Sequence, residues 1–501
     1  MVRLKLSWSS CLAALLLIPL FCLPALYNRH PVLYPDSVGY FHSGSAALDA
    51  LAPVESAVED LAEGKAHAAS PLNRQASRPA EKTMAERSLD GTSTSRSPYY
   101  GVLLVVLTHL GGEWALPLVQ VVLSIMAIML AARHLGRPRT LALFSICAIT
   151  GLVAGLGIFS TTIMPDVFAG LAILATALLI TAFRSMSGKE RCFWLTVLLA
   201  SCLFHKANLA TSAMLAMLGI GYCWLTARVD KVLAASLFGV LAAAVIGHMV
   251  VNIAVEKTSG RPPIQTPFLL ARLVGDGTAE QYLRKHCPQA GYALCRFLPR
   301  MPMSENDFLW SSVPPKTVMK TAPVETQSAI AAQSNAIIRG VLTEFPLQQA
   351  KASSENAIRQ LFDVGIREYG LGIAGMQKDD SAMAPILQAY SDSRIAEGSM
   401  PLGAMSTVML IAYIAGFGAL AALFFSRSRR MLPAQAWKIV GIVVTGIVIN
   451  ALISGVIAGV FDRYQGRVAW LIPLVALLLW YQRGWPTTTS PGERQSRPAP
   501  Q

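Results

Sequence analysis

The sequence predicts an all-α membrane protein that crosses the bilayer many times. Hydrophobic residues make up 53% of the 501 residues and charged residues only 14%, and the mean hydropathy is +0.47. Apolar runs recur at about the 20-residue length that a helix needs to cross a ~30 Å hydrocarbon core. Inside lipid such runs must be helical, because every backbone N–H and C=O needs an internal partner.

We expect about ten spans, with both ends of the chain in the cytoplasm. The first, at about 8–27, follows a basic start, and the sequence leaves open whether it is retained or cleaved as a signal peptide. The others are expected at 114–132, 140–159, 166–183, 192–205, 208–226, 232–254, 405–425, 437–460 and 467–481. With this arrangement the basic loops face the cytoplasm, as the positive-inside rule predicts for a bacterial inner-membrane protein. Their basic residues are Arg133, Arg137, Arg139, Arg184, Lys189, Arg191, Arg228, Lys231, Arg427, Arg429 and Arg430.

The spans divide the chain into blocks. These are a first helix (1–27), a periplasmic loop (28–113), a six-helix block (114–254), a mainly helical periplasmic domain (255–404), a three-helix block (405–481) and a cytoplasmic tail (482–501). Within the first loop, residues of about 50–95 have too few large apolar side chains to bury a core, so we expect a disordered insertion. In 255–404, apolar residues at helical spacing predict one amphipathic helix before Pro346 and another after it. Such helices either lie on the membrane surface or pack into a cap over the spans.

Two acids on the expected periplasmic side are candidate catalytic residues. Asp36 follows Pro35 in a short turn flanked by Tyr34 and Tyr40, and Tyr40 is a further polar candidate. Asp166 follows a proline at the start of the fourth span. Each has a structural alternative, since Asp36 suits an Asx-type turn and Asp166 suits helix capping. Two acids beside apolar spans on one face nevertheless favour a functional site.

Cations gather on the same expected face. His205 and Lys206 lie between two spans, where Lys206 either snorkels to the interface or binds a lipid phosphate, and His205 is a hydrogen-bond donor or a proton shuttle. Arg463 and Arg467 oppose the positive-inside trend and therefore need compensation. Either Asp462 supplies it as a local ion pair, or a phosphate does so as a ligand.

These features resemble the GT-C superfamily of integral membrane glycosyltransferases, of the protein O-mannosyltransferase and lipid A aminoarabinose transferase type. The resemblance lies in the acid after span one, the Pro-Asp at span four, and the large late outside loop. The stretch Arg96-Ser97-Pro98-Tyr99-Tyr100-Gly101 is similar to a recurring element of bacterial members. The resemblance to the superfamily covers about 1–230 in the order and spacing of these features, and the rest of the chain only in the layout of its spans and loops.

The resemblance implies an inverting transfer of sugar from a polyprenyl-phosphate donor to an envelope glycan, lipid or protein. Asp36 and Asp166 match the two loop acids of that family in position. Lys206, Arg463, Arg467 and Arg96 are the expected phosphate ligands. A divalent metal ion stays open, because some family members need one and others do not. The rival hypotheses are a transporter or flippase of envelope lipids, and a non-catalytic polysaccharide assembly factor.

The positions of the cysteines and the origin of the net charge indicate which cysteines are paired and whether the protein binds nucleic acid. Six of the eight cysteines lie in or beside apolar runs, where cysteine commonly behaves as a small hydrophobe. Cys287 and Cys295 lie in a polar segment with Pro288 and Gly291 between them, and we predict a disulfide there. The net charge of +13 follows from the basic loops, and none of the usual nucleic-acid-binding modules is present in the sequence.

Overall fold

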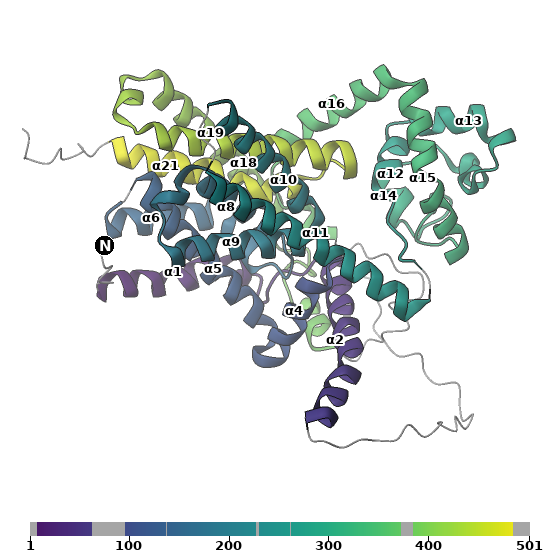
Figure 1. Ribbon diagram of the computed structural model, residues 1–501, viewed down its shortest axis with the longest axis horizontal. Helices are drawn as coiled ribbons and strands as arrows, with labels where there is room; N and C mark the ends of the chain where they lie inside the picture. The colour runs from purple at the N-terminus through teal and green to yellow at the C-terminus, as the bar shows by residue number, and fades with distance from the viewer. Residues whose placement is uncertain are drawn as a thin grey trace, which may run out of the picture.

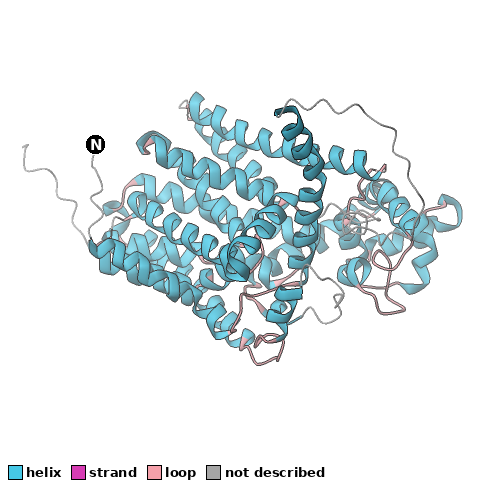
Figure 2. Ribbon diagram, turned by 90° about the horizontal axis from the view of Figure 1, so that it is seen from below, coloured by secondary structure: helices cyan, strands magenta, loops and turns pink. Residues whose placement is uncertain are grey.

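The computed structural model describes residues 8–62, 96–136, 138–226, 230–260, 262–371 and 384–483. In this part of the chain the regular elements are helices, which confirms the predicted all-α class. The β-type pairing recorded there is one parallel bridge between Val32 and Thr162. Figures 1 and 2 show a block of long helices beside a smaller group of short ones. Most of the expected cytoplasmic tail, residues 484–501, lies outside the described residues.

Six helical stretches in the described residues are long and apolar enough to cross a membrane. They are Pro98–Leu135, Val167–Ser185, Lys206–Leu225, Lys231–Thr258, Leu402–Phe425 and Ala434–Ala458. They contain helices α4 (Pro98–Gly111) and α5 (Ala115–Leu135), α8 (Val167–Ala182), α10 (Lys206–Leu225), α11 (Lys231–Ser259), α18 (Leu402–Phe425), and α19 (Ala434–Ile453) with the π-helical turn η6 (Ser454–Ala458). The other four expected spans coincide with α1 (Trp8–Tyr27), α6 (Thr140–Leu152), α9 (Gly188–Phe204) and α21 (Leu471–Arg483). The total of ten spans stays a prediction, because six stretches of the described residues meet the criteria of length and hydropathy.

Two of the spans expected to be single helices are broken. The helix expected at 140–159 ends at Leu152, and α7 (Leu156–Thr161) follows after Gly155, whose φ of 86° is left-handed and favours glycine. The helix expected at 467–481 is divided into α20 (Asp462–Ala469) and α21. Pro473 has no N–H with which to continue the ladder from the carbonyl of Ala469, which accounts for the second break.

In its described residues, 28–62 and 96–113, the loop expected at 28–113 is largely helical. Asp36 does not lie in a turn but near the start of α2 (Pro35–Ala62), which packs against α4. The two helices cross at a glycine pair, since a Cβ on Gly44 would lie 2.1 Å from the carbonyl carbon of Gly101. The expected insertion at 50–95 begins inside α2, and its residues 63–95 lie outside the described part of the chain.

The segment expected as one domain, 255–404, is divided between two hydrophobic cores. A separate core includes side chains of α12 (Phe268–Gly275), α13 (Thr278–Ala290), α14 (Glu305–Trp310) and α15 (Val324–Glu344). We call this group the small domain. In α15 the buried residues Ile330, Ile337 and Val341 face this core, as the sequence pattern predicts for an amphipathic helix. A disulfide joins Cys287 and Cys295, which is the predicted pairing.

After the small domain the chain returns to the long helices. The connection is α16 (Pro346–Phe362), which packs against η6 and α19. It is followed by the 3₁₀ helix η4 (Arg367–Leu371) and by α17 (Ala384–Ser391), and the buried residues Ile366, Tyr369 and Ile386 belong to the main core. The late segment therefore contributes directly to the helical block.

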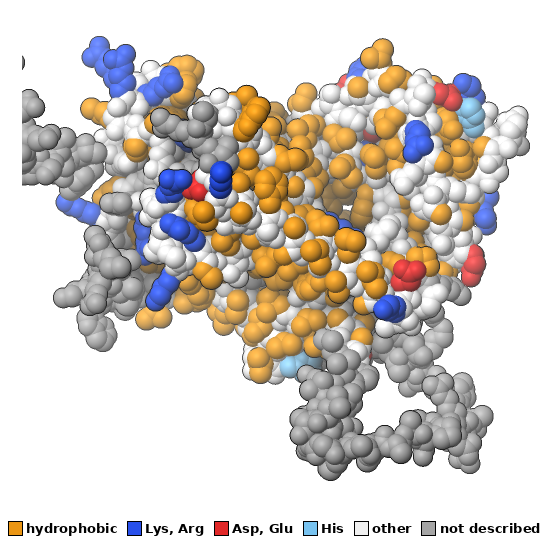
Figure 3. All heavy atoms as spheres, in the orientation of Figure 1, with side chains coloured by type: hydrophobic (Ala, Val, Ile, Leu, Met, Phe, Trp, Pro, Cys, Tyr) orange, Lys and Arg blue, Asp and Glu red, His pale blue; other side chains and the backbone are white. Residues whose placement is uncertain are grey.

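The two ends of the helical block differ in charge. In Figure 3, Lys and Arg side chains gather at the left end, the end at which the connection between α18 and α19 lies in Figure 1. Hydrophobic side chains cover the middle of the same face, and the small domain lies at the right end. We call the right end of the block the domain end.

Candidate functional site

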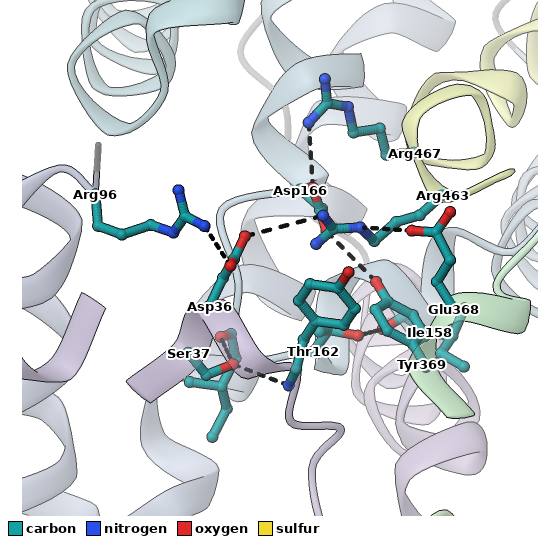
Figure 4. A network of polar contacts seen from close by, with 12 residues as sticks. Asp36, Ser37, Arg96, Ile158, Thr162, Asp166, Glu368, Tyr369, Arg463 and Arg467 are labelled. Carbon is teal, nitrogen blue, oxygen red and sulfur yellow. Dashed lines mark hydrogen bonds and ion pairs between the residues drawn. The ribbon is translucent and has the colours of Figure 1, made fainter. Parts of the chain in front are cut away.

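The loop after α1 is attached to the start of α8 by backbone pairing. The Val32 N–H donates to the carbonyl of Thr161 (3.2 Å), and the Ile163 N–H donates to the carbonyl of Val32 (2.9 Å). The Ser37 hydroxyl donates to the carbonyl of Ile163 (2.7 Å). These bonds bring Asp36 and Asp166, which are 130 positions apart in the sequence, to the same end of the block (Figure 4).

Asp166 pairs with two arginines. Its side chain is 2% exposed and, although Asp166 is the N-cap residue of α8, makes no capping hydrogen bond to that helix. One carboxylate oxygen lies 3.3 Å from Nη1 of Arg463, and the other lies 3.3 Å from Nη1 of Arg467. The Tyr369 hydroxyl donates to the same carboxylate at 3.5 Å. Because a buried charge needs a partner, Asp166 and the two arginines depend on one another.

Arg463 occupies the centre of the arrangement. Besides Asp166, it has Asp36 Oδ2 at 3.9 Å from Nη2 and Glu368 Oε2 at 3.8 Å from Nε (Figure 4). Its guanidinium lies over the ring of Tyr34, 3.9 Å from the ring centroid. The acids from the first and second loops thus share one cation, which is buried with only 4% of its side chain exposed.

Arg96 is also paired within the site. It donates to Asp36 Oδ1, and the two side chains remain 19% and 23% exposed. The stretch 96–101 therefore docks beside Asp36 through this pair and through the packing of α4 against α2. Arg96 had been expected to bind a donor phosphate, and the structure gives it a carboxylate partner from its own chain.

Asp462 does not compensate the neighbouring arginines, so that alternative was wrong. Its Oδ2 accepts from the backbone N–H of Arg367 (2.8 Å) and lies 3.1 Å from Nε of the same residue. The physical reason is the return of the chain through η4, which places Arg367 against the start of α20. The compensation of Arg463 and Arg467 comes from acids distant in sequence.

Glu368 is a site residue that the sequence reasoning missed. It lies in η4, and its Oε2 and the Nε of Arg463 are buried atoms without a hydrogen-bond partner in the described structure. Burial raises the pKa of Glu368 to about 8, against the lowering effect of Arg463. The sequence around Glu368 contains no motif that we recognise, and the buried residues Val364, Ile366 and Tyr369 beside it resemble an ordinary packed segment.

The remaining candidates lie at the border of the site. His205 Nδ1 accepts from the N–H of Ala207 (3.2 Å), so neutral His205 carries its proton on Nε2. Burial lowers the pKa of His205 well below 6.5, and the site's arginines lower it further, which favours a hydrogen-bond donor over a proton shuttle. Exposed Lys206 donates to Gln265 Oε1 (3.3 Å), and buried Tyr40 packs edge-on against Tyr100.

The chemistry of the site is that of a carboxylate–arginine cluster, by which we mean Asp36, Arg96, Asp166, Glu368, Arg463 and Arg467. Within the described residues, no group of three His, Cys, Asp or Glu side chains is arranged to hold a metal ion. Three arginines meet three carboxylates, of which Glu368, with its raised pKa, holds its proton more strongly than an ordinary glutamate. Three arginines gathered at one end of the block are the chemistry that an anionic ligand such as a phosphate needs.

We compared the chain with known protein families, curated proteins and solved structures. No family model matches the chain, and neither a curated protein nor a solved structure matches it.

Proposed function

We propose that this protein is a membrane glycosyltransferase that takes a sugar from a polyprenyl-phosphate donor on the non-cytoplasmic face of the bacterial inner membrane. The observation that carries the proposal is the convergence of Asp36 and Asp166 on Arg463 at the domain end of a block of apolar helices. This end lies away from the basic side chains at the left of Figure 3, which by the positive-inside rule favours the outer face.

The two acids have different roles in this proposal. Asp36 is 23% exposed and Asp166 only 2%, so Asp36 is the acid that an incoming acceptor can reach. Asp36 accepts the proton of the acceptor hydroxyl while the acceptor oxygen bonds to the sugar and the bond from sugar to phosphate breaks. Asp166 holds Arg463 and Arg467 in place, and the arginines stabilise the charge on the departing lipid phosphate.

The test compares Asp36→Asn with Asp49→Asn, an exposed aspartate on the same helix. Mass spectrometry of envelope glycolipids and glycans from a deletion strain, complemented with each variant, measures the transferred sugar. Removing a general base lowers a rate by roughly 10²- to 10⁴-fold, so Asp36→Asn should lose the product that Asp49→Asn retains, at equal membrane levels. If Asp36→Asn transfers sugar normally, Asp36 is not the base. A deletion strain with an unchanged envelope would instead favour the transporter or assembly-factor hypotheses.

A further inference from the structure

Helix α16 buries amide side chains and exposes two apolar side chains near its C-terminal end, beside the exposed side chain of Arg359. Its buried residues include Gln349, Asn356 and Gln360, whereas Ile358 is 61% exposed and Phe362 is 57% exposed. A helix on the surface of a soluble domain buries its apolar side and exposes its polar side. Ile358 and Phe362 lie about one turn apart, so they form an exposed apolar strip at this end of α16, and the long side chain of Arg359 beside them can extend its charged group to the headgroups.

The buried polar side of α16 is fully used for hydrogen bonds. Gln349 Nε2 and Asn356 Nδ2 donate to the carboxylate of Asp276 in the small domain, at 2.8 and 2.9 Å. Gln360 donates from Nε2 to the carbonyl of Phe461 (2.8 Å) and accepts from its N–H (2.9 Å). These bonds fix the rotation of α16 about its axis, so Ile358 and Phe362 are held outward.

The exposed apolar side chains continue the surface of a candidate membrane span. The backbone of α16 touches η6, because a Cβ on Gly455 would lie 2.8 Å from the carbonyl oxygen of Asn356. Leu452 and Ile457 in the stretch Ala434–Ala458 are themselves 42% and 43% exposed. The end of α16 therefore borders the side of a helix whose composition suits lipid.

We propose that the C-terminal turns of α16 lie against the lipid bilayer, with Ile358 and Phe362 in contact with acyl chains. The proposal concerns this surface alone and does not rest on the glycosyltransferase activity. It is favoured over a protein partner by the direct contact of α16 with η6, since any lipid around the outer end of α19 also reaches the neighbouring turns of α16.

Charged residues mark where α16 leaves the hydrocarbon. On the same side of the helix, one and two turns before Ile358, lie the exposed residues Glu355 and Lys351. At 1.5 Å per residue they are roughly 5 and 10 Å from Ile358 along the helix axis, which suits a position among headgroups. The lipid boundary then lies beside the start of α20, because Gln360 holds the residue directly before Asp462.

The test measures the collisional accessibility of nitroxide labels in phosphatidylcholine nanodiscs. Ile358→Cys and Phe362→Cys are labelled in full-length protein in which Cys11, exposed Cys192 and half-buried Cys223 are replaced by serine. Val245→Cys, exposed on α11, is the reference for lipid, and Arg284→Cys, exposed on α13, is the reference for water. Labels that replace exposed side chains leave the core intact, and monodisperse elution confirms folding of each variant.

Both α16 labels should resemble the label at 245, with high accessibility to oxygen and low accessibility to a water-soluble nickel chelate. Accessibility to the chelate like that at 284 would place this surface in water and overturn the proposal. Low accessibility to both reagents would show that a second copy or another protein covers the surface, and this result would also overturn it.

Discussion

Replacing Asp166 should destabilise the protein far more than replacing Asp36. Asp166→Asn keeps the size of the side chain but leaves Arg463 and Arg467 buried without their shared carboxylate. Breaking a buried ion pair by removing one partner costs about 3–5 kcal/mol, whereas losing a favourable charge at a helix N-terminus costs only about 0.3–1 kcal/mol. Because the structure shows the ion pairs and no capping hydrogen bond, we expect the larger cost. Asp36→Asn should cost less, since Asp36 and Arg96 are both partly exposed to water, which screens the charge left behind.

The assay is thermal unfolding of purified variants in detergent, followed by tryptophan fluorescence. Asp166→Asn should lower the unfolding midpoint well below those of Asp36→Asn and the control Asp49→Asn. Arg463 retains Asp36 and Glu368 nearby, but among the residues that the structure describes Asp166 alone lies within ion-pair distance of Arg467. The double variant Asp166→Asn with Arg467→Gln should therefore be more stable than Asp166→Asn alone. An unchanged midpoint for Asp166→Asn, or additive losses in the double variant, would refute the ion-pair reasoning.

Three further predictions concern pH, the border of the site and the small domain. Because the pKa of Glu368 is raised from 4.5 to about 8 on folding, the folded state binds the extra proton between these values. The thermal midpoint should fall as the pH rises from 5 to 8, and Glu368→Gln should flatten this dependence; an equal slope in both proteins would contradict the assignment. Lys206→Ala should leave the thermal midpoint nearly unchanged and, if Lys206 binds a donor phosphate, raise the apparent KM about 10- to 150-fold, whereas an unchanged KM favours snorkelling. Replacing Cys287 and Cys295 by serine should destabilise the small domain by roughly 2–3 kcal/mol, seen as faster limited proteolysis between α12 and α15.

The parts of the fold that were predictable depend on local patterns. Apolar runs predicted the long helices, the spacing of Ile330, Ile337 and Val341 predicted a buried helical face, and a short Cys–Cys loop predicted the disulfide. Breaks within apolar runs were not predictable in this way. Gly155 and Pro473 interrupt runs that are apolar throughout. Hydropathy averaged over a window stays high across one such residue, so it does not show where the helix breaks.

The sequence predicted most residues of the candidate site, but it did not predict which of them contact one another. Asp36, Asp166, Arg463 and Arg467 were selected because they are charged residues next to apolar spans. Which acid meets which arginine depends on the bridge at Val32 and on the return of the chain through η4, and neither leaves a local sequence signal. Glu368 was missed for the same reason, since its role arises only from its distance to Arg463.

The pairing within the cluster limits how an anion can bind. Arg463 and Arg467 direct Nη1 atoms at Asp166, which is enclosed, so a phosphate cannot displace this carboxylate without stranding a buried charge. The Nε atoms of the two arginines have no hydrogen-bond partner in the described structure. Both Nε atoms are buried, so a phosphate reaches them only when neighbouring side chains move aside. A phosphate bound there would leave both ion pairs intact, and it would be favoured while Glu368, 3.8 Å from one Nε, is protonated. Anion affinity should therefore fall as the pH rises through about 8, whereas in Glu368→Gln it should not, and titration calorimetry with inorganic phosphate at pH 6.5 and 9 separates the two cases. Equal pH dependence in both proteins would show that Glu368 does not face the anion.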